Sequence, residues 1–235
     1  MPDDPQKIFA TRSEQYPQPD DSETFRSALE KAIESVPVFG PATSVIMSRF
    51  WVPNGSRRLE EWLKDFADDF DRHCKNCSVE NLINDEAFIS ASIQVARMVV
   101  GTHQEEKRKY LRNALLNIAI GNARNETKQQ IFLNAIEAFA PAHVKTLNLI
   151  WRSTSPNWDT LRIPRDQRTY GTAIGIVSPE LQGQPALIDA VLAELRNRGF
   201  TTLSVANTPF PQGGLLTNLT AEFLTFVLSP DELPK

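Results

Sequence analysis

The stretch that decides the fold spans residues 84–151 and reads NDEAFISASIQVARMVVGTHQEEKRKYLRNALLNIAIGNARNETKQQIFLNAIEAFAPAHVKTLNLIW. Apolar side chains recur in it every three or four residues, which is the spacing of one face of an α-helix. Four such stripes follow one another, and the breaks between them hold Gly101, Gly121 and Pro141. We predict four consecutive α-helices, and the short turns indicate that neighbouring helices pack antiparallel.

Each predicted helix has an expected inward face. These faces hold Phe88, Ile89, Ser92, Ala96 and Val99, then Leu111, Ala114, Leu115 and Ile118, then Ile131, Phe132, Ala135, Ile136 and Phe139, and finally Val144, Leu147, Ile150 and Trp151. Thr102 and Glu105 have the spacing of a capping box at the start of the second helix. Asn125 is expected to begin the third helix, since asparagine is a favoured N-cap.

The residues before this stretch extend the helical domain toward the N-terminus. Leu59, Trp62, Leu63, Phe66 and Phe70 make another strong helical face. Two further helices are expected within residues 22–50. Residues 1–21 mix proline with Asp and Gln and show no apolar period, which is typical of a disordered tail. We therefore expect a helical domain over residues 22–151.

The character of the sequence changes after residue 151. Residues 152–169 are rich in Ser, Thr, Pro and Arg, and indicate a linker or long loop. The order helix, strand, turn, strand, helix is then predicted over residues 185–198, 201–205, 209–214, 215–216 and 220–228. This order is like that of a winged-helix unit, expected over residues 170–228 with a tail at 229–235. The predicted fold class is mainly α, a multi-helix bundle followed by a small winged-helix-like α+β unit.

The composition is ordinary for a soluble globular protein. Of the 235 residues, 41% are hydrophobic and 23% are charged, and the net charge of −4 gives no general attraction to nucleic acid or anionic membrane. No stretch reaches the roughly 18–20 apolar residues that a membrane-spanning helix needs. The first residues lack the pattern of a secretory signal. We expect a cytoplasmic protein.

One cluster resembles a metal site. It contains His73, Cys74 and Cys77, and a C-x-x-C pair can bring two thiolates to one ion. A structural zinc site needs four ligands, however, and the other histidines, His103 and His143, are far away in the sequence. Two reduced thiols at a helix end are the favoured interpretation. We predict no metal and no cofactor.

Catalytic motifs are missing from the sequence. It has neither the G-x-S-x-G nucleophile motif nor a phosphate-binding loop of the G-x-x-x-x-G-K type. Most carboxylates fall on helix faces that are expected to be solvated. We therefore predict no catalytic residues and no enzyme activity.

A polar group lies on the predicted helix that follows Thr102. It consists of Arg112, Asn113 and Asn117, and the two asparagines are one turn apart beside the apolar face. The favoured interpretation is helix–helix hydrogen bonding at the edge of the core. The alternative is a small polar recognition patch that binds a partner.

Three functions follow as alternatives. The first is a non-enzymatic protein-interaction module, because the uncharged residues 199–221 offer an interface for a protein partner or a second copy. The second is a transcriptional regulator that reads DNA with residues 185–198. That alternative fits weakly, because residues 141–235 hold eight Lys or Arg and eight Asp or Glu, and phosphate contacts need local positive charge. The third is a membrane-surface effector that acts through the largely apolar residues 38–51.

Several segments resemble a known family. They are FISA at residues 88–91, EKRKYLRNA at 106–114, QIFL at 130–133 and PAH at 141–143, with a closing segment at 216–224. Together they resemble the abortive-infection alpha (Abi-alpha) group of bacterial helical proteins, over roughly residues 35–228. The resemblance implies a bacterial cytoplasmic helical protein with a role in phage defence. It carries over no catalytic residues.

Overall fold

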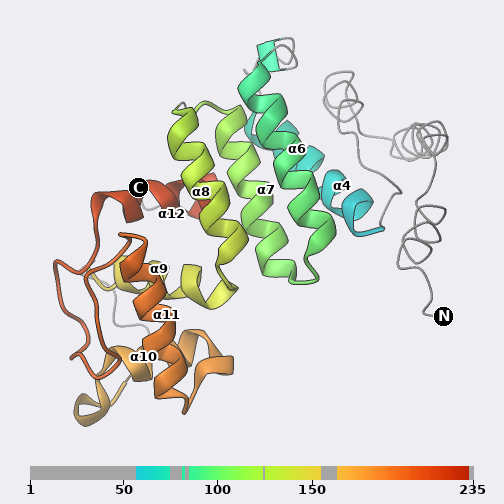
Figure 1. The fold of residues 1–235 in the computed structure, drawn as a ribbon. Coiled ribbons are helices and arrows are strands. Elements are labelled where there is room, and N and C mark those ends of the chain that lie inside the picture. Colours follow the sequence, from blue (N-terminus) through green and yellow to red (C-terminus); the bar gives the residue numbers. More distant parts are fainter. Residues whose placement is uncertain (1–56, 75–80, 83–84, 124, 155–162, 233–235) are drawn as a thin grey trace, which may run out of the picture.

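The computed structural model describes residues 57–74, 81–82, 85–123, 125–154 and 163–232 (Figure 1). In this part of the chain the structure is mainly helical, as predicted. The α-helices are α4 (Arg57–His73), α6 (Glu86–Gly101), α7 (Glu105–Ala119), α8 (Glu126–Ala138), α9 (Pro141–Arg152), α10 (Tyr170–Val177), α11 (Pro185–Asn197) and α12 (Asn218–Val227). Short 3-10 helices are η2 (Arg165–Gln167), η3 (Pro179–Leu181) and η4 (Pro230–Glu232). The predictions for residues 1–56, including the segment 38–51, lie outside the described residues.

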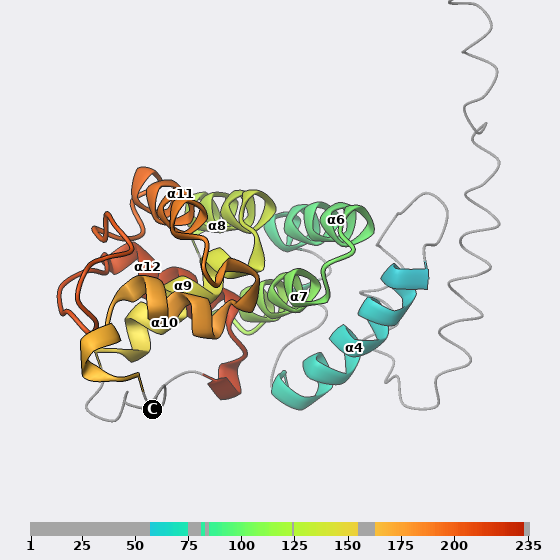
Figure 2. The ribbon, with the colours of Figure 1, turned by 90° about the horizontal axis from the view of Figure 1, so that it is seen from below.

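Helices α6, α7 and α8 form a three-helix bundle in which each helix contacts the other two, and α4 packs obliquely against α6 and α7 (Figures 1 and 2). The α4 helix packs against α6 and α7 through its predicted apolar face. Within that face the ring of Trp62 stacks on Phe66 at 5.6 Å, and the Trp62 indole N–H donates to the backbone carbonyl of Arg108 at 2.8 Å. At the edge of the same contact, the Arg112 guanidinium pairs with Asp65 at 2.6 Å and with Asp69 at 2.8 Å.

Most of the side chains that were predicted to face inward are buried. The helix face of α8 differs at one position, because Ile131 is 46% exposed while Leu133 is fully buried. The buried residues of α8 are Gln129, Phe132, Leu133, Ala135 and Ile136. Their spacing places the inward face to one side of Ile131. The prediction that Ile131 faces inward was therefore wrong. Ile131 is apolar but lies outside the buried face of α8, and it was included in the predicted inward face.

Asn125 and Gly121 mark helix ends as predicted, whereas the capping box predicted at Thr102 does not form. Asn125 caps α8 by accepting from the Lys128 N–H at 3.0 Å, and Gly121 follows α7 with a φ of 79°, a conformation that favours glycine. The prediction of a capping box at Thr102 and Glu105 was wrong. Thr102 is instead the C-cap of α6, and its hydroxyl accepts from the N–H of Gln104 at 3.3 Å. Gln104 is the N-cap of α7, which begins at Glu105 without a side-chain capping bond.

The predicted winged-helix unit is not supported, because the described residues contain no β-strand. The two expected strands make only an isolated bridge between Thr201 and Leu216. The Thr201 side chain makes hydrogen bonds in this region. The Thr201 hydroxyl donates to the carbonyl of Leu215 at 2.7 Å and accepts from the N–H of Leu203 at 3.1 Å. The bond from Leu203 to Thr201 is local, and local side-chain bonds of this kind compete with strand pairing.

Residues 170–177 form a helix that was not predicted. This helix, α10, begins after Thr169, whose hydroxyl accepts from the N–H of Thr172 at 3.2 Å. Its first two N–H groups bond to the carbonyls of Thr208 and Ala206. Residues 206 and 208, which lie between the predicted first strand and the predicted turn, therefore complete the start of α10.

The α12 helix joins the two halves of the described chain. It packs against α7 on one side and against α9 on the other, while α9 also packs against α10 and α11. The core is continuous from Leu59 to Leu228, although the sequence predicted a domain boundary near residue 151. Phe132 lies within this core. The centre of its ring is 5.5 Å from that of Phe223 and 5.4 Å from that of Phe226. No described helix has the length and apolar character needed to cross a membrane.

We predict that Phe132→Ala lowers the free energy of unfolding by about 3–5 kcal/mol, because the change opens a cavity between α8 and α12. Chemical denaturation followed by circular dichroism measures it. Ile131→Ala, on the same helix but exposed, is the control, and its loss is expected to stay below ~1 kcal/mol. Equal losses in the two variants would contradict the placement of α8.

Candidate functional site

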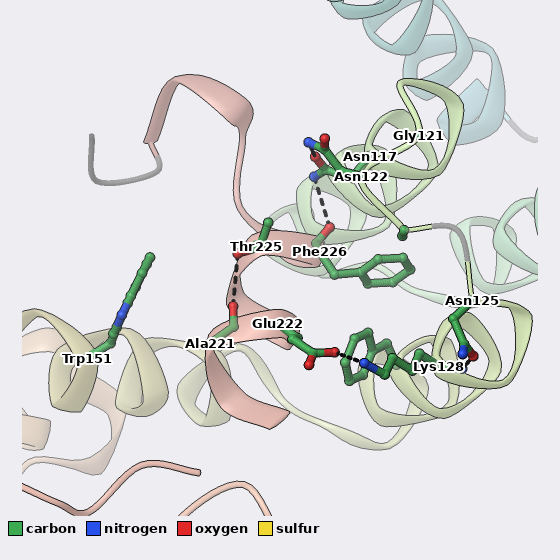
Figure 3. A pocket seen from close by; sticks show the side chains of 12 residues that line it. Asn117, Gly121, Asn122, Asn125, Lys128, Trp151, Ala221, Glu222, Thr225 and Phe226 are labelled. Atoms are coloured by element: carbon green, nitrogen blue, oxygen red, sulfur yellow. Dashed lines mark hydrogen bonds and ion pairs between the residues drawn. The ribbon is translucent and has the colours of Figure 1, made fainter. Parts of the chain in front are cut away.

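A pocket of about 550 Å³ lies where the end of α7 meets the start of α8, with α12 as another wall (Figure 3). Three aromatic residues line it, Phe132, Trp151 and Phe226, and the rest of the lining is mostly polar. Phe132 and Phe226 are buried, whereas Trp151 on α9 is partly exposed. The pocket thus combines aromatic surface with amide groups, a combination that is common in small-molecule sites.

The pocket is lined by two charged residues, Lys128 and Glu222, and they form an ion pair with each other. The Lys128 ammonium on α8 lies 2.5 Å from a carboxylate oxygen of Glu222 on α12, and both side chains are almost half exposed. The pair crosses from one wall to the other (Figure 3). Its two charges cancel, so the lining is neutral overall.

Asparagine side chains build the wall beneath α12. The Asn117 amide is fully buried and donates to the carbonyls of Phe226 and Leu228, both at 3.1 Å, while Asn113 donates to the carbonyl of Val227 at 2.9 Å. The last carbonyls of a helix have no partner inside that helix. The two asparagines therefore cap α12 from α7, and Asn122 extends the network by donating to Asn117 Oδ1 at 3.1 Å.

The predicted polar group of Arg112, Asn113 and Asn117 is divided by the fold. Asn117 lines the pocket, Asn113 lies behind it in the α7–α12 contact, and Arg112 pairs with α4. The two asparagines make helix–helix hydrogen bonds, the first of the two interpretations. The other polar and aromatic residues of the lining were not predicted as site residues: Trp151, Asn122, Asn125, Lys128 and Glu222. The frequency of asparagine between residues 117 and 125 was the one available signal.

We predict that Asn117→Ala lowers the free energy of unfolding by about 2–4 kcal/mol, because it leaves buried carbonyls of α12 without donors. Urea titration measures the loss. The matched control is Asn134→Ala on the exposed face of α8, where the side chain makes one surface bond to Gln94. If both changes cost the same, the asparagine cap does not hold α12.

A second hollow, of about 470 Å³, separates α10 from the start of α11; we call it the uncharged groove. Its twelve lining residues share the absence of charge: Thr169, Gly171, Thr172, Gly175, Ile176, Gln182, Gly183, Gln184, Pro185, Ile188, Ala206 and Asn207. Glycines let its walls approach closely. A Cβ atom at Gly171 would lie 3.1 Å from the Cβ of Ala206.

The one buried histidine among the described residues lies between α9 and α11. The ring of His143 stacks on Phe139 at 4.9 Å, and its Nε2 lies 3.1 Å from a carboxylate oxygen of Glu194. Its Nδ1 accepts from the backbone N–H of Ala140 at 3.2 Å. Burial lowers the pKa of His143, against the opposing effect of the Glu194 carboxylate, while the charge of Arg198 adds to the lowering.

We predict that the free energy of unfolding falls as the pH drops below about 6.5, the ordinary pKa of histidine. The unfolded chain then binds a proton that folded His143 still excludes, so acid favours unfolding until the pH passes the lowered pKa. Denaturation of wild type and His143→Gln across this range measures the effect, and the variant is expected to lose less stability. His103→Gln, at an exposed position, is the control, and a wild-type slope in His143→Gln would contradict the prediction.

The structure describes two of the three weak metal candidates. His73 Nε2 lies 3.4 Å from a carboxylate oxygen of Asp231, and Cys74 is buried at the end of α4. Cys77 lies outside the described residues. Within the described part of the chain, no three His, Cys, Asp or Glu residues are grouped as metal ligands.

Comparisons with family models, with curated proteins and with solved structures give no match to this chain. The resemblance to the abortive-infection alpha group therefore stays a prediction from the sequence.

Proposed function

We propose that this protein is a non-enzymatic interaction module, and that a second copy of the chain binds at the uncharged groove. The observation that carries the proposal is the composition of this groove, in which none of the twelve lining residues is charged. The neighbouring segment, residues 199–221, is also free of charge. Charged residues are depleted at the centre of protein interfaces, so this is the composition expected of a docking surface.

One exposed apolar side chain lines the groove, and two more come directly before lining residues in the sequence. Ile176 lines it and is 43% exposed, while Leu187 and Val205 are 45% and 49% exposed and each precedes a lining residue in the sequence. These are three of the four large exposed hydrophobic residues in the described part of the chain. Burial of such side chains against a partner removes apolar surface from water and favours association.

The lack of charge favours a second copy as the partner. Most homodimers have twofold symmetry, in which the same patch of each subunit faces itself. A charged residue near the axis of such a dimer meets its own like charge. A surface without charged residues avoids this repulsion, and Ile176 and Leu187 supply the apolar contact.

We predict that Leu187→Glu and Ile176→Glu convert a wild-type dimer into a monomer, because each places like charges in the symmetric interface. Size-exclusion chromatography with light scattering measures the mass over a range of concentrations. Leu187 lies in the first turn of α11, where a carboxylate suits the helix dipole, so this variant is expected to remain folded.

Ile131→Glu is the matched control, because Ile131 is equally exposed but lies on α8, away from the groove. It is expected to leave the dimer intact. A wild-type protein that stays monomeric at ~100 µM, a concentration at which an interface of micromolar Kd is saturated, contradicts the proposal. A dimer that survives both groove substitutions contradicts it as well.

A further inference from the structure

We infer that residues 42–51 of the same chain pack on the edge of α6 that borders α4. We call this edge the α6 stripe, and it is formed by Ile89, Ile93 and Val100. The inference is independent of the self-association proposed above, because no residue of α6 lines the uncharged groove. It gives an intramolecular binding site to a segment for which contact with a membrane surface was one alternative from the sequence.

The α6 helix carries apolar side chains beyond its buried face. Its buried residues share one face: Phe88, Ala91, Ser92, Val95, Ala96 and Val99. Ile89, Ile93 and Val100 lie beside that face at helical spacing, and all three are partly exposed. Apolar side chains over so much of a helix surface are typical of a helix that is covered on more than one side. Burial of the α6 stripe against another segment would therefore stabilise the fold.

The α6 stripe lies on the side of α6 that borders α4. On the other edge of α6, Gln94 donates to the side chain of Asn134 on α8 at 3.2 Å, so the stripe lies on the edge away from α8. The α6 helix also contacts α7 and α4. Figure 2 shows α8 and α4 on different sides of α6, with α7 between them. A segment that covers the stripe would consequently lie beside α4 as well.

The start of α4 lies close to the end of α6. Arg58 of α4 lines a small hollow together with Glu105, the first residue of α7. Trp62, about one turn further along α4, donates its indole N–H to a carbonyl in the first turn of α7 at 2.8 Å. Only residues 102–104 separate α7 from the end of α6. The start of α4 is therefore also close to Val100, the last residue of the α6 stripe.

The short connection to α4 places residues 42–51 within reach of the α6 stripe. Only residues 52–56 separate this segment from the start of α4. Even when fully extended, such a connection spans only about 20 Å, since each residue adds at most about 3.6 Å. The α6 helix itself is about 24 Å long, at about 1.5 Å per residue. The segment can therefore reach the stripe of its own chain, and no second copy is needed.

The composition of residues 42–51 is complementary to the α6 stripe. Large apolar residues make up half of the segment: Val45, Ile46, Met47, Phe50 and Trp51. Arg49 is its one charged residue. A helix predicted over such a segment is apolar on most sides, and helices of this kind are usually buried. Contact with the isoleucines of the stripe removes apolar surface of both partners from water, and this favours docking.

Hydrogen exchange of the full chain, followed by mass spectrometry of its peptides, tests the inference. The backbone amides of residues 42–51 are expected to exchange at least about tenfold more slowly than in an unfolded chain of the same sequence, because docking on α6 protects them. Ile93→Glu places a charge within the stripe and is expected to abolish this protection. Ile131→Glu makes the same change on α8, away from the stripe, and is expected to leave the protection intact.

Cross-linking determines which chain supplies the segment. In a chain whose two cysteines are replaced by alanine, Ile93→Cys is combined in turn with Val45→Cys, Ile46→Cys and Met47→Cys. A short bismaleimide is expected to join at least one of these pairs within a single chain. The same three substitutions combined with Ile131→Cys are expected to give no product. Circular dichroism shows whether Ile93→Glu remains folded, and the cross-links test the inference if it does not.

Four results would overturn the inference. Residues 42–51 could exchange at the rate of an unfolded chain in wild type, or remain protected in a folded Ile93→Glu variant. In a mixture of isotope-labelled and unlabelled chains, cross-links only between chains would assign the stripe to a second copy. Flotation of the wild-type protein with phosphatidylglycerol vesicles, with residues 42–51 protected only in their presence, would assign the segment to a membrane surface.

Discussion

The buried C-terminal end of α12 is the constraint on which the rest of the structure depends. This helix packs between α7 and α9, so its last carbonyls cannot reach water. The side-chain amides of Asn113 and Asn117 supply the missing donors from α7. Because a buried carbonyl without a donor is costly, these bonds determine where α12 lies on α7. The bundle of α6, α7 and α8 and the C-terminal helices consequently share one core.

The pocket and the uncharged groove differ in chemistry. The pocket is formed where the α12 helix covers the turn between α7 and α8, and it contains amides, aromatic rings and one ion pair. The uncharged groove lies between α10 and α11, where Gly171 allows the walls to approach closely. Since α9 contacts α10, α11 and α12, it supports both regions.

The sequence allowed prediction of local structure wherever the signal was itself local. The periodic stripes located α4, α6, α7, α8, α9, α11 and α12, and Asn125 and Gly121 marked helix ends correctly. The candidate site was harder to predict from the sequence, because its lining comes from four helices. Of these residues, only Asn117 had been predicted as a candidate site residue. The winged-helix prediction failed because short β-branched segments have the same appearance whether they pair as strands or bond through their own hydroxyl groups. Thr201 does the latter.

The sequence by itself therefore determined the number and type of most described helices and the absence of charge in residues 199–221. Helical spacing and composition are properties of neighbouring residues, so no folded context is needed to recognise them. Only the tertiary structure decided that Asn117 caps α12, that Trp151, Asn122 and Asn125 line one pocket, and that residues 206 and 208 complete the start of α10. These contacts join residues distant in the chain, and their energy exists only when the core brings the helices together.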